Sequence, residues 1–317
     1  MSQRLHITKT PKCYVGGAFI RSESGRVAEL LDATGAFFAN IPQCTRKDLR
    51  NAVEAAAKAG PGWAKRSAFN RGQILYRLAE MMEARGVELA DSITLSGVSK
   101  AEASREVAAA IERVVHYAGW TDKYEQVLGS VNPVASAHFN FTVTEPMGIV
   151  GILAPDDAPI LGLLSLILPA ITSGNSVVAL ASTTQPYPSI LLGEMLATSD
   201  LPGGVVNLLT GVRSELIPTF ATHEHIRAIS GVLSAAECKT VRLGAAESVK
   251  RVHLRKVGEP RSESRLQPET REKQSASPPE GGAPNREPLD WFADKMQGVE
   301  EIRALVEFKT TWHPVGA

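Results

Sequence analysis

The sequence lacks the features that define several large classes of protein. Its 317 residues carry 34 Lys or Arg and 34 Asp or Glu, so the formal net charge is zero. No long basic run is present, and the electrostatic footprint of a protein that binds nucleic acid or an anionic membrane is therefore missing. We expect neither of these partners.

Cysteine and long apolar runs are also scarce. Cys13, Cys44 and Cys238 are far apart in the sequence and form no CxxC pair. This favours a reducing compartment and argues against a structural zinc site, so no metal is expected. The first residues lack the apolar core of a signal peptide, and the longest apolar run, 160–171, is too short to span a bilayer and contains Pro169. We predict a cytoplasmic protein.

The residues that are present describe a patterned, globular chain that is 44% hydrophobic. In the first third, 1–133, apolar residues recur at helical spacing in three stretches. One begins after Thr45 and closes at Gly60, one covers 71–86, and a long one is capped by Ser99. Such stripes are typical of helices that face a core, and we predict that this part is helical.

From residue 134 the hydrophobic period changes. An exposed strand is predicted within 134–146, and strands then alternate with helices through 147–258. Strand–helix–strand repetition implies a parallel sheet with right-handed crossovers. We therefore expect an α/β fold with a Rossmann-like core, whose strands are predicted at 147–154, 175–181, 204–210, 226–230 and 250–256.

The segment 259–288 has the composition of a linker. Its only large apolar side chain is Leu266, and six of its residues are proline. It has too little apolar surface to offset the entropy of ordering it, so it is predicted to be disordered. A further strand is predicted in 289–317.

No GxGxxG motif follows the first strand of the core, where the turn is APDDAP (154–159). Several segments nevertheless resemble the aldehyde dehydrogenase superfamily, most of all the degenerate second module of aldehyde dehydrogenase family 16. They are YVGGAFIRSESG (14–25), AGPGWAKRSAFNRGQILYRLAEMME (59–83), EPMGIVGILAPDDAP (145–159), PAITSGNSVVALAS (169–182), LPGGVVNLLTG (201–211), HEHIRAISG (223–231) and RALVEFKTTWHP (303–314). The resemblance implies the nucleotide-binding domain of that superfamily, with N-terminal helices and a β-arm.

The resemblance also implies where the functional residues would lie. The family's turn with an oxyanion-donating Asn aligns with Pro155, Asp156 and Asp157, and an ionised Asp157 would repel a developing negative charge. As adjacent residues, Asp156 and Asp157 are expected to point apart in a solvated turn. Where the family holds the adenosine ribose with Lys and Glu, this chain has Leu180 and Thr183.

The pyrophosphate turn of the family appears as Ser230, Gly231 and Val232, and the glycine that opens the next helix appears as Ala236. We therefore expect NAD or NADP to bind weakly, if it binds. The residues predicted for this degenerate cofactor site are Pro155, Asp157, Ser182, Gly211, Ser230 and Gly231.

The catalytic positions depart further from the family. Arg255 aligns with the general-base Glu, and no cysteine follows Cys238. The segment 259–288 occupies the interval of the family's catalytic domain and is too short to be one, so we predict that this domain is missing and name no catalytic residue. Cys238 as a substitute nucleophile, and His223 with His225 as metal ligands, are less favoured than structural roles.

Three functions remain open from the sequence. The first is a structural or regulatory subunit, the second an NAD(P)-dependent dehydrogenase that oxidises an aldehyde to an acid, and the third a nucleotide-binding regulatory module. The resemblance implies that residues 135–145 and 302–312 pair as an oligomerisation arm. We expect this arm to dock on a complete aldehyde dehydrogenase subunit, with arm-to-arm pairing in a homodimer as the alternative.

Overall fold

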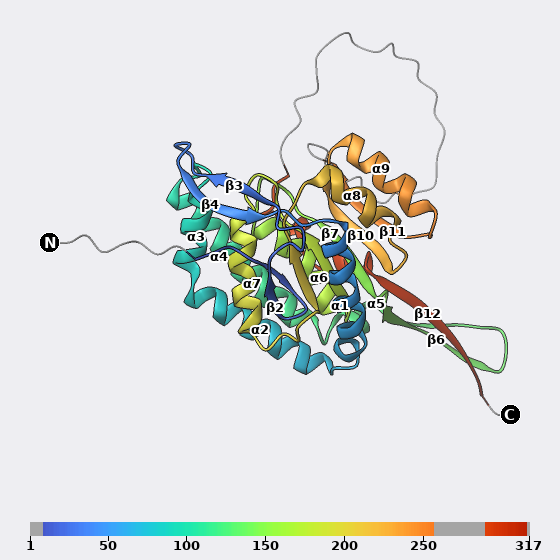
Figure 1. Ribbon diagram of the computed structural model, residues 1–317. Coiled ribbons are helices and arrows are strands. Elements are labelled where there is room, and N and C mark those ends of the chain that lie inside the picture. Colours follow the sequence, from blue (N-terminus) through green and yellow to red (C-terminus); the bar gives the residue numbers. More distant parts are fainter. Residues whose placement is uncertain (1–8, 257–288, 316–317) are drawn as a thin grey trace, which may run out of the picture.

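The computed structural model describes residues 9–256 and 289–315 (Figure 1). The predicted linker 259–288 lies outside these ranges. At the centre is a seven-stranded sheet in the order β11-β10-β7-β8-β9-β1-β2. Its strands are β7 (Ile149–Leu153), β8 (Ser176–Leu180), β9 (Val206–Leu209), β10 (Ile226–Leu233), β11 (Arg251–Lys256), β1 (Cys13–Val15) and β2 (Ala18–Ile20). The first five are parallel and β1 runs antiparallel to β9, so the predicted α/β fold is confirmed, with a mixed but mostly parallel sheet.

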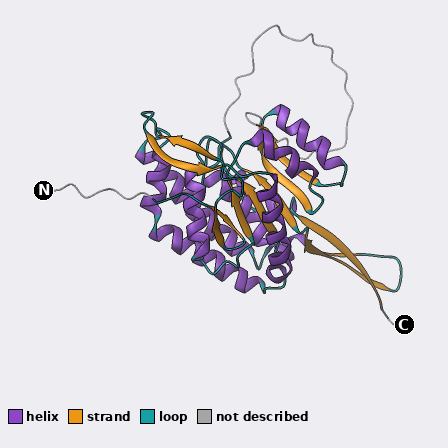
Figure 2. Cartoon of the chain, viewed as in Figure 1, coloured by secondary structure: helices purple, strands orange, loops and turns teal. Residues whose placement is uncertain are grey.

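Helices cover both faces of this sheet (Figure 2). Two apolar cores result, one on each face. All twelve residues of α6 are buried, which explains why its sequence shows no polar face. The helices are α1 (Arg46–Ala64), α2 (Ala68–Ala84), α3 (Gly86–Thr94), α4 (Lys100–Trp120), α5 (Tyr124–Leu128), α6 (Leu161–Thr172), α7 (Tyr187–Ala197), α8 (Arg213–Thr222), α9 (Ala235–Ala246) and α10 (Val299–Arg303). None of the helices in the described ranges is both long and apolar enough to cross a membrane.

The N-terminal part differs from the prediction of an all-helical first third. Residues 13–42 form β1, β2, β3 (Val27–Leu31) and β4 (Phe37–Pro42). Gly16 and Gly17 both have positive φ, which allows the tight turn between β1 and β2. These strands are three to six residues long, too short for a clear period in the sequence.

The two predicted N-caps are confirmed, whereas α2 begins three residues before the predicted stretch 71–86 and the predicted end of α1 is wrong. Capping boxes begin α1 at Thr45 and α4 at Ser99. Helix α1 continues past Gly60 to Ala64 because Trp63 is fully buried and its indole N–H donates to the carbonyl of Ile171 at 2.8 Å. Tertiary packing here outweighs the local tendency of Gly and Pro to end a helix.

The β-arm projects from the body of the molecule (Figure 1). It contains β5 (Ser130–Asn132), β6 (His138–Pro146) and β12 (Val306–Pro314), with β12 and β6 antiparallel along their whole length. The prediction of a strand within 289–317 holds only from Val306. Residues 289–305 instead form a short 3-10 turn (Asp294–Met296) and α10, which pack on the core.

Candidate functional site

The place where a Rossmann-like sheet binds a nucleotide follows from its topology. The chain runs from β7 to β8 and β9 on one side, and returns to place β10 and β11 on the other. The point where the order reverses therefore lies between β7 and β10. Ligands of such folds bind in the crevice outside the carboxyl ends of the strands at this switch point.

Arg213, the first residue of α8, lies across this crevice. Its guanidinium donates to the carbonyl of Ala154, just after β7, at 2.8 Å and to the carbonyl of Val232, in β10, at 3.1 Å. Its Nε donates to Glu237 at 2.9 Å, and only 13% of the Arg213 side chain is exposed. The chain's own cation thus spans the two strand ends that would flank a cofactor.

The two helices that follow β7 and β10, α6 and α9, also hold a carboxylate of the chain at their N-termini. Glu237 accepts hydrogen bonds from the backbone and the hydroxyl of Ser234, both at 2.9 Å, and caps α9. Buried Glu106, from α4, accepts from the backbone N–H groups of Ile160 and Leu161 at 2.9 and 3.1 Å, at the start of α6. A helix N-terminus is where a phosphate would bind, so these carboxylates would compete with it and repel it.

The ionisation of these two carboxylates follows from their surroundings. Burial alone would raise the pKa of Glu237, but hydrogen bonds from Arg213 and Ser234 and the charge of Arg213 lower it overall. Burial raises the pKa of Glu106, and its two backbone hydrogen bonds oppose that shift only in part.

The position that the resemblance assigns to the general base is engaged in a buried ion pair. Arg255, at the end of β11, binds Glu301 of α10, and their side chains are 7% and 3% exposed. His253 lies on the same strand, with its Nε2 3.0 Å from Glu301. Arg255 carries no proton-accepting group, so it cannot activate a water as the family's Glu does.

The segment that contains Trp291 packs against the turn after β7 and the start of α6. The indole of buried Trp291 donates to Asp157 at 3.1 Å and packs beside Gly162, where a Cβ would lie 3.2 Å from the indole. Arg113 fixes this segment by donating to the carbonyls of Trp291 at 2.9 Å and Met296 at 3.0 Å. Burial raises the pKa of Asp157, and the hydrogen bond from Trp291 opposes that shift.

Asp156 and Asp157 point to different partners, as the sequence predicted for adjacent carboxylates. Asp156 accepts from the Ser182 hydroxyl and from the Thr183 backbone N–H, both at 2.7 Å. The turn after β7 is therefore not simply solvated, because Asp156 ties it to the turn after β8. Ser182, a predicted cofactor residue, is used in this internal contact.

The other predicted cofactor residues lie around the same edge but with little access. Ser230 and Gly231 are within β10, paired with β7 and β11, and not in a turn after the strand. A Cβ on Gly231 would lie 2.7 Å from the carbonyl of Leu153, so glycine is required there by strand packing. Pro155 is buried, and Gly211 lies close to the backbone of Cys44.

Leu180 and the two less favoured alternatives also have structural surroundings. Leu180 and Cys238 are buried in the core beside α1. The backbone N–H of His225 donates to the ring of His223 at 3.3 Å. Within 9–256 and 289–315 the structure brings together no group of three or more His, Cys, Asp or Glu that could hold a metal ion.

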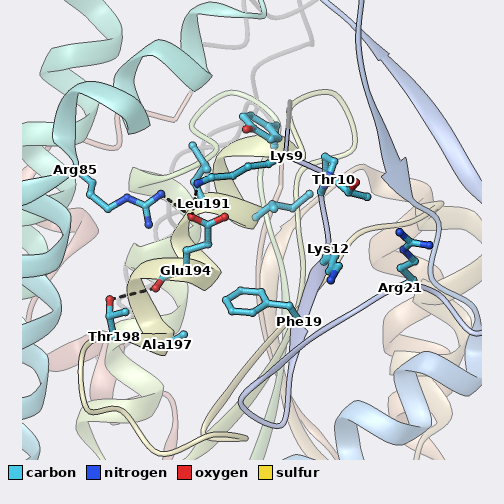
Figure 3. Close-up of a pocket in the computed structure, with 13 residues that line it drawn as sticks. Lys9, Thr10, Lys12, Phe19, Arg21, Arg85, Leu191, Glu194, Ala197 and Thr198 are labelled. Atoms are coloured by element: carbon cyan, nitrogen blue, oxygen red, sulfur yellow. Dashed lines mark hydrogen bonds and ion pairs between the residues drawn. The ribbon is translucent and has the colours of Figure 1, made fainter. Parts of the chain in front are cut away.

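A separate pocket of about 640 Å³ lies between residues 9–21 and α7 (Figure 3). Glu194 is at its centre and pairs with Lys9 at 3.0 Å and with Arg85 at 2.6 Å. None of the predicted cofactor residues lines it. The pocket is therefore distinct from the switch-point crevice.

Sequence reasoning missed Arg213, Trp291 and Glu301 as the residues that fill the site. Glu237 carried a local signal, since Ser234 followed three residues later by Glu is a capping-box pattern. The contacts of Arg213, Trp291 and Glu301 join residues that are far apart in the sequence. Arg213 and Val232 are 19 positions apart, and Trp291 and Asp157 are 134 positions apart, so no local pattern predicts these contacts.

Comparison with known proteins gives the same assignment for most of the chain. The sequence profile of the aldehyde dehydrogenase family matches residues 19–259. Retinal dehydrogenase 2 of Gallus gallus is 32% identical over 253 residues, which are 78% of this chain and 48% of that protein. Omega-crystallin of Enteroctopus dofleini is 28% identical over 256 residues, which are 79% of this chain and 51% of that protein.

Solved structures agree with these relatives. The NAD+ complex of an aldehyde dehydrogenase from Bacillus cereus superposes with a TM-score of 0.76 at 26% identity, over 79% of this chain and 51% of that one. The chain thus spans about half the length of the curated relatives and structures that it matches.

Proposed function

The chain belongs to the aldehyde dehydrogenase family, and we propose that it is a non-catalytic member that acts as a structural or regulatory subunit. One observation carries this proposal: the carboxyl edge of the sheet is occupied by the chain's own side chains. Arg213 and Glu237 pair across the switch point, and Arg255 pairs with Glu301 at the general-base position. These contacts would have to break before a cofactor or a catalytic water could take their place.

The proposal extends to the kind of family member. We infer that the chain is most like the degenerate second module of aldehyde dehydrogenase family 16 and that it works in the cytoplasm. Support for the first comes from Asp157, Leu180 and Arg255 in place of the family's functional residues, and for the second from its sparse, unpatterned cysteines.

We further propose that the β-arm docks on a complete aldehyde dehydrogenase subunit. The large exposed apolar side chains of the three arm strands are Val131, Phe139, Val143, Phe308 and Trp312. The outer edge of β12 pairs with no other strand among the described residues. An unpaired edge with exposed apolar groups is a surface onto which another sheet can add.

The test of the non-catalytic role is a pair of measurements on the purified chain. Reduction of NAD or NADP should stay at the background rate with short aliphatic and aromatic aldehydes. Thermal melting with millimolar NAD or NADP should show no shift, since a ligand stabilises a protein only when it binds the folded state. Turnover that is lost in Cys238→Ser would refute the proposal, and a concentration-dependent thermal shift without turnover would favour a nucleotide-binding regulatory module.

The test of the partner is co-expression with a complete aldehyde dehydrogenase of the same genome, followed by size-exclusion chromatography with light scattering. A hetero-oligomer is expected, and Phe308→Asp in β12 should dissociate it. Phe69→Asp is the matched control, because Phe69 is also an exposed phenylalanine, 71% against 43% for Phe308, but belongs to α2 and not to the arm. A homodimer that ignores the partner and survives Phe308→Asp would refute the docking.

A further inference from the structure

Two cysteines that are 31 positions apart meet in the core. Cys13 is the first residue of β1 and Cys44 lies between β4 and α1. Both are 1% exposed, and their sulfur atoms are 3.4 Å apart. This pair could not be predicted from a sequence motif, since neither residue belongs to a CxxC motif.

The hydrogen bonds around the two cysteines run in series from the Cys44 thiol through Cys13 and Thr210 to the carbonyl of Pro42. The Thr210 hydroxyl donates to the carbonyl of Pro42 at 2.5 Å, so its oxygen accepts from the Cys13 thiol at 3.3 Å. The Cys13 sulfur is then the acceptor for the Cys44 thiol. The hydrogen bond to Cys13 and burial both raise the pKa of Cys44, which keeps it a neutral thiol.

The segment between the two cysteines is a structural unit. It contains β1 and β2, which end one side of the central sheet, and then β3 and β4, which form a separate two-stranded sheet before the chain reaches α1. The Cys44 backbone N–H also donates to the carbonyl of Thr210 at 2.9 Å, so the base of this segment is held near the end of β9. A covalent bond between Cys13 and Cys44 would close this segment into a loop.

We propose that Cys13 and Cys44 are a redox modification site that closes reversibly into a disulfide. With hydrogen peroxide as oxidant, the two thiols lose two hydrogens, one S–S bond forms, and the peroxide is reduced to two molecules of water. To form the bond, the sulfurs must approach from 3.4 Å to about 2.05 Å, the length of a disulfide.

Disulfide formation changes the surroundings in two ways. Cys13 loses the hydrogen that it donates to Thr210, and the loop that contains β1 to β4 becomes covalently closed. Closing a loop stabilises a protein chiefly by restricting its unfolded state. Because both sulfurs are buried, oxidation proceeds through local opening of the segment and is slow compared with that of an exposed thiol.

The experiment treats the folded, full chain with hydrogen peroxide and then counts thiols in denaturant. The count should fall from three to one, the intact mass should fall by two hydrogens, and both should return after dithiothreitol. Peptide mapping of the wild-type protein should find Cys13 joined to Cys44, and the melting temperature of the oxidised form should be higher. Mapping the wild type keeps the test decisive even if a cysteine variant fails to fold.

Variants give the matched controls. Cys238→Ser should still lose two thiols, whereas Cys13→Ala and Cys44→Ala should lose none to an intramolecular disulfide. Three thiols that persist in the native protein at equilibrium with an oxidising glutathione buffer would overturn the proposal. So would a disulfide that includes Cys238, or overoxidation of Cys13 without disulfide.

Discussion

Replacing Glu301 by glutamine should destabilise the fold strongly. The substitution keeps the size of the side chain but removes the charge that faces Arg255 in a site where both side chains are almost fully buried. Removing one partner of a buried ion pair leaves the other charge uncompensated, which costs about 3–5 kcal/mol. We therefore expect a loss of this size in the free energy of unfolding at pH 7.

The dependence of stability on pH tests the same interaction between Glu301 and Arg255 in a second way. Burial acts to raise the pKa of Glu301, but hydrogen bonds from His253 and Arg255 and the charge of Arg255 lower it from 4.5 to about 2. A depressed pKa in the folded state means that the stabilisation is complete above pH 4.5 and is lost as the pH falls towards 2. A shift of this size corresponds to roughly 3 kcal/mol, which agrees with the estimate for removing the partner.

The assay is urea unfolding followed by circular dichroism, at pH 7 and at intervals down to pH 3. The difference between wild type and Glu301→Gln should shrink as the pH falls, because a protonated Glu301 resembles glutamine. Glu300→Gln is the control, since Glu300 is 58% exposed and 3.6 Å from Arg303, and an exposed pair contributes at most about 1 kcal/mol. A loss below 1 kcal/mol at pH 7 in Glu301→Gln, or a difference that is constant with pH, would refute the reasoning.

Three further predictions follow from contacts at the carboxyl edge of the sheet. Trp291→Ala should lower the free energy of unfolding by about 3–5 kcal/mol by leaving a cavity, whereas Trp291→Phe should lose less, about 1–2 kcal/mol, from the hydrogen bond to Asp157 and a smaller cavity, both measured by urea unfolding. Ser234→Ala should cost about 1 kcal/mol by removing the cap of α9, and a change in melting temperature within error would contradict it. Arg213→Ala should cost roughly 2 kcal/mol or more, because it removes the cation that pairs with Glu237 and a donor to two carbonyls, and it should still give no thermal shift with NAD. A shift in this variant alone would show that Arg213 is the main barrier to the cofactor.

The parallel core could be predicted from the sequence because its strands are buried on both faces. The run predicted at 175–181 forms β8 at Ser176–Leu180, and all five of its residues are buried. The strands of 13–42 could not be predicted in this way, because β3 contains no buried residue and its sequence, VAELL, is neither a continuous apolar run nor a regular alternation. A local pattern indicates a strand only where burial requires one of these two patterns in the side chains.

For the candidate site, the resemblance supports an expectation that Leu180 and Arg255 replace functional groups of the family, but it does not predict which contacts form there. The contacts of Arg213, Trp291 and Cys13 join residues 19, 134 and 31 positions apart, respectively. Such contacts depend on the tertiary fold, and no spacing rule in the sequence reports them.

The pairing of Arg213 with Glu237 has a consequence for how this protein can evolve. Removing Arg213 leaves Glu237 without its cation and the two strand-end carbonyls without this donor, and removing Glu237 leaves Arg213 without its carboxylate. A single substitution at this pair therefore lowers stability, and selection for folding removes it. On the proposed function, a gain of cofactor binding at this edge would require both residues to change together.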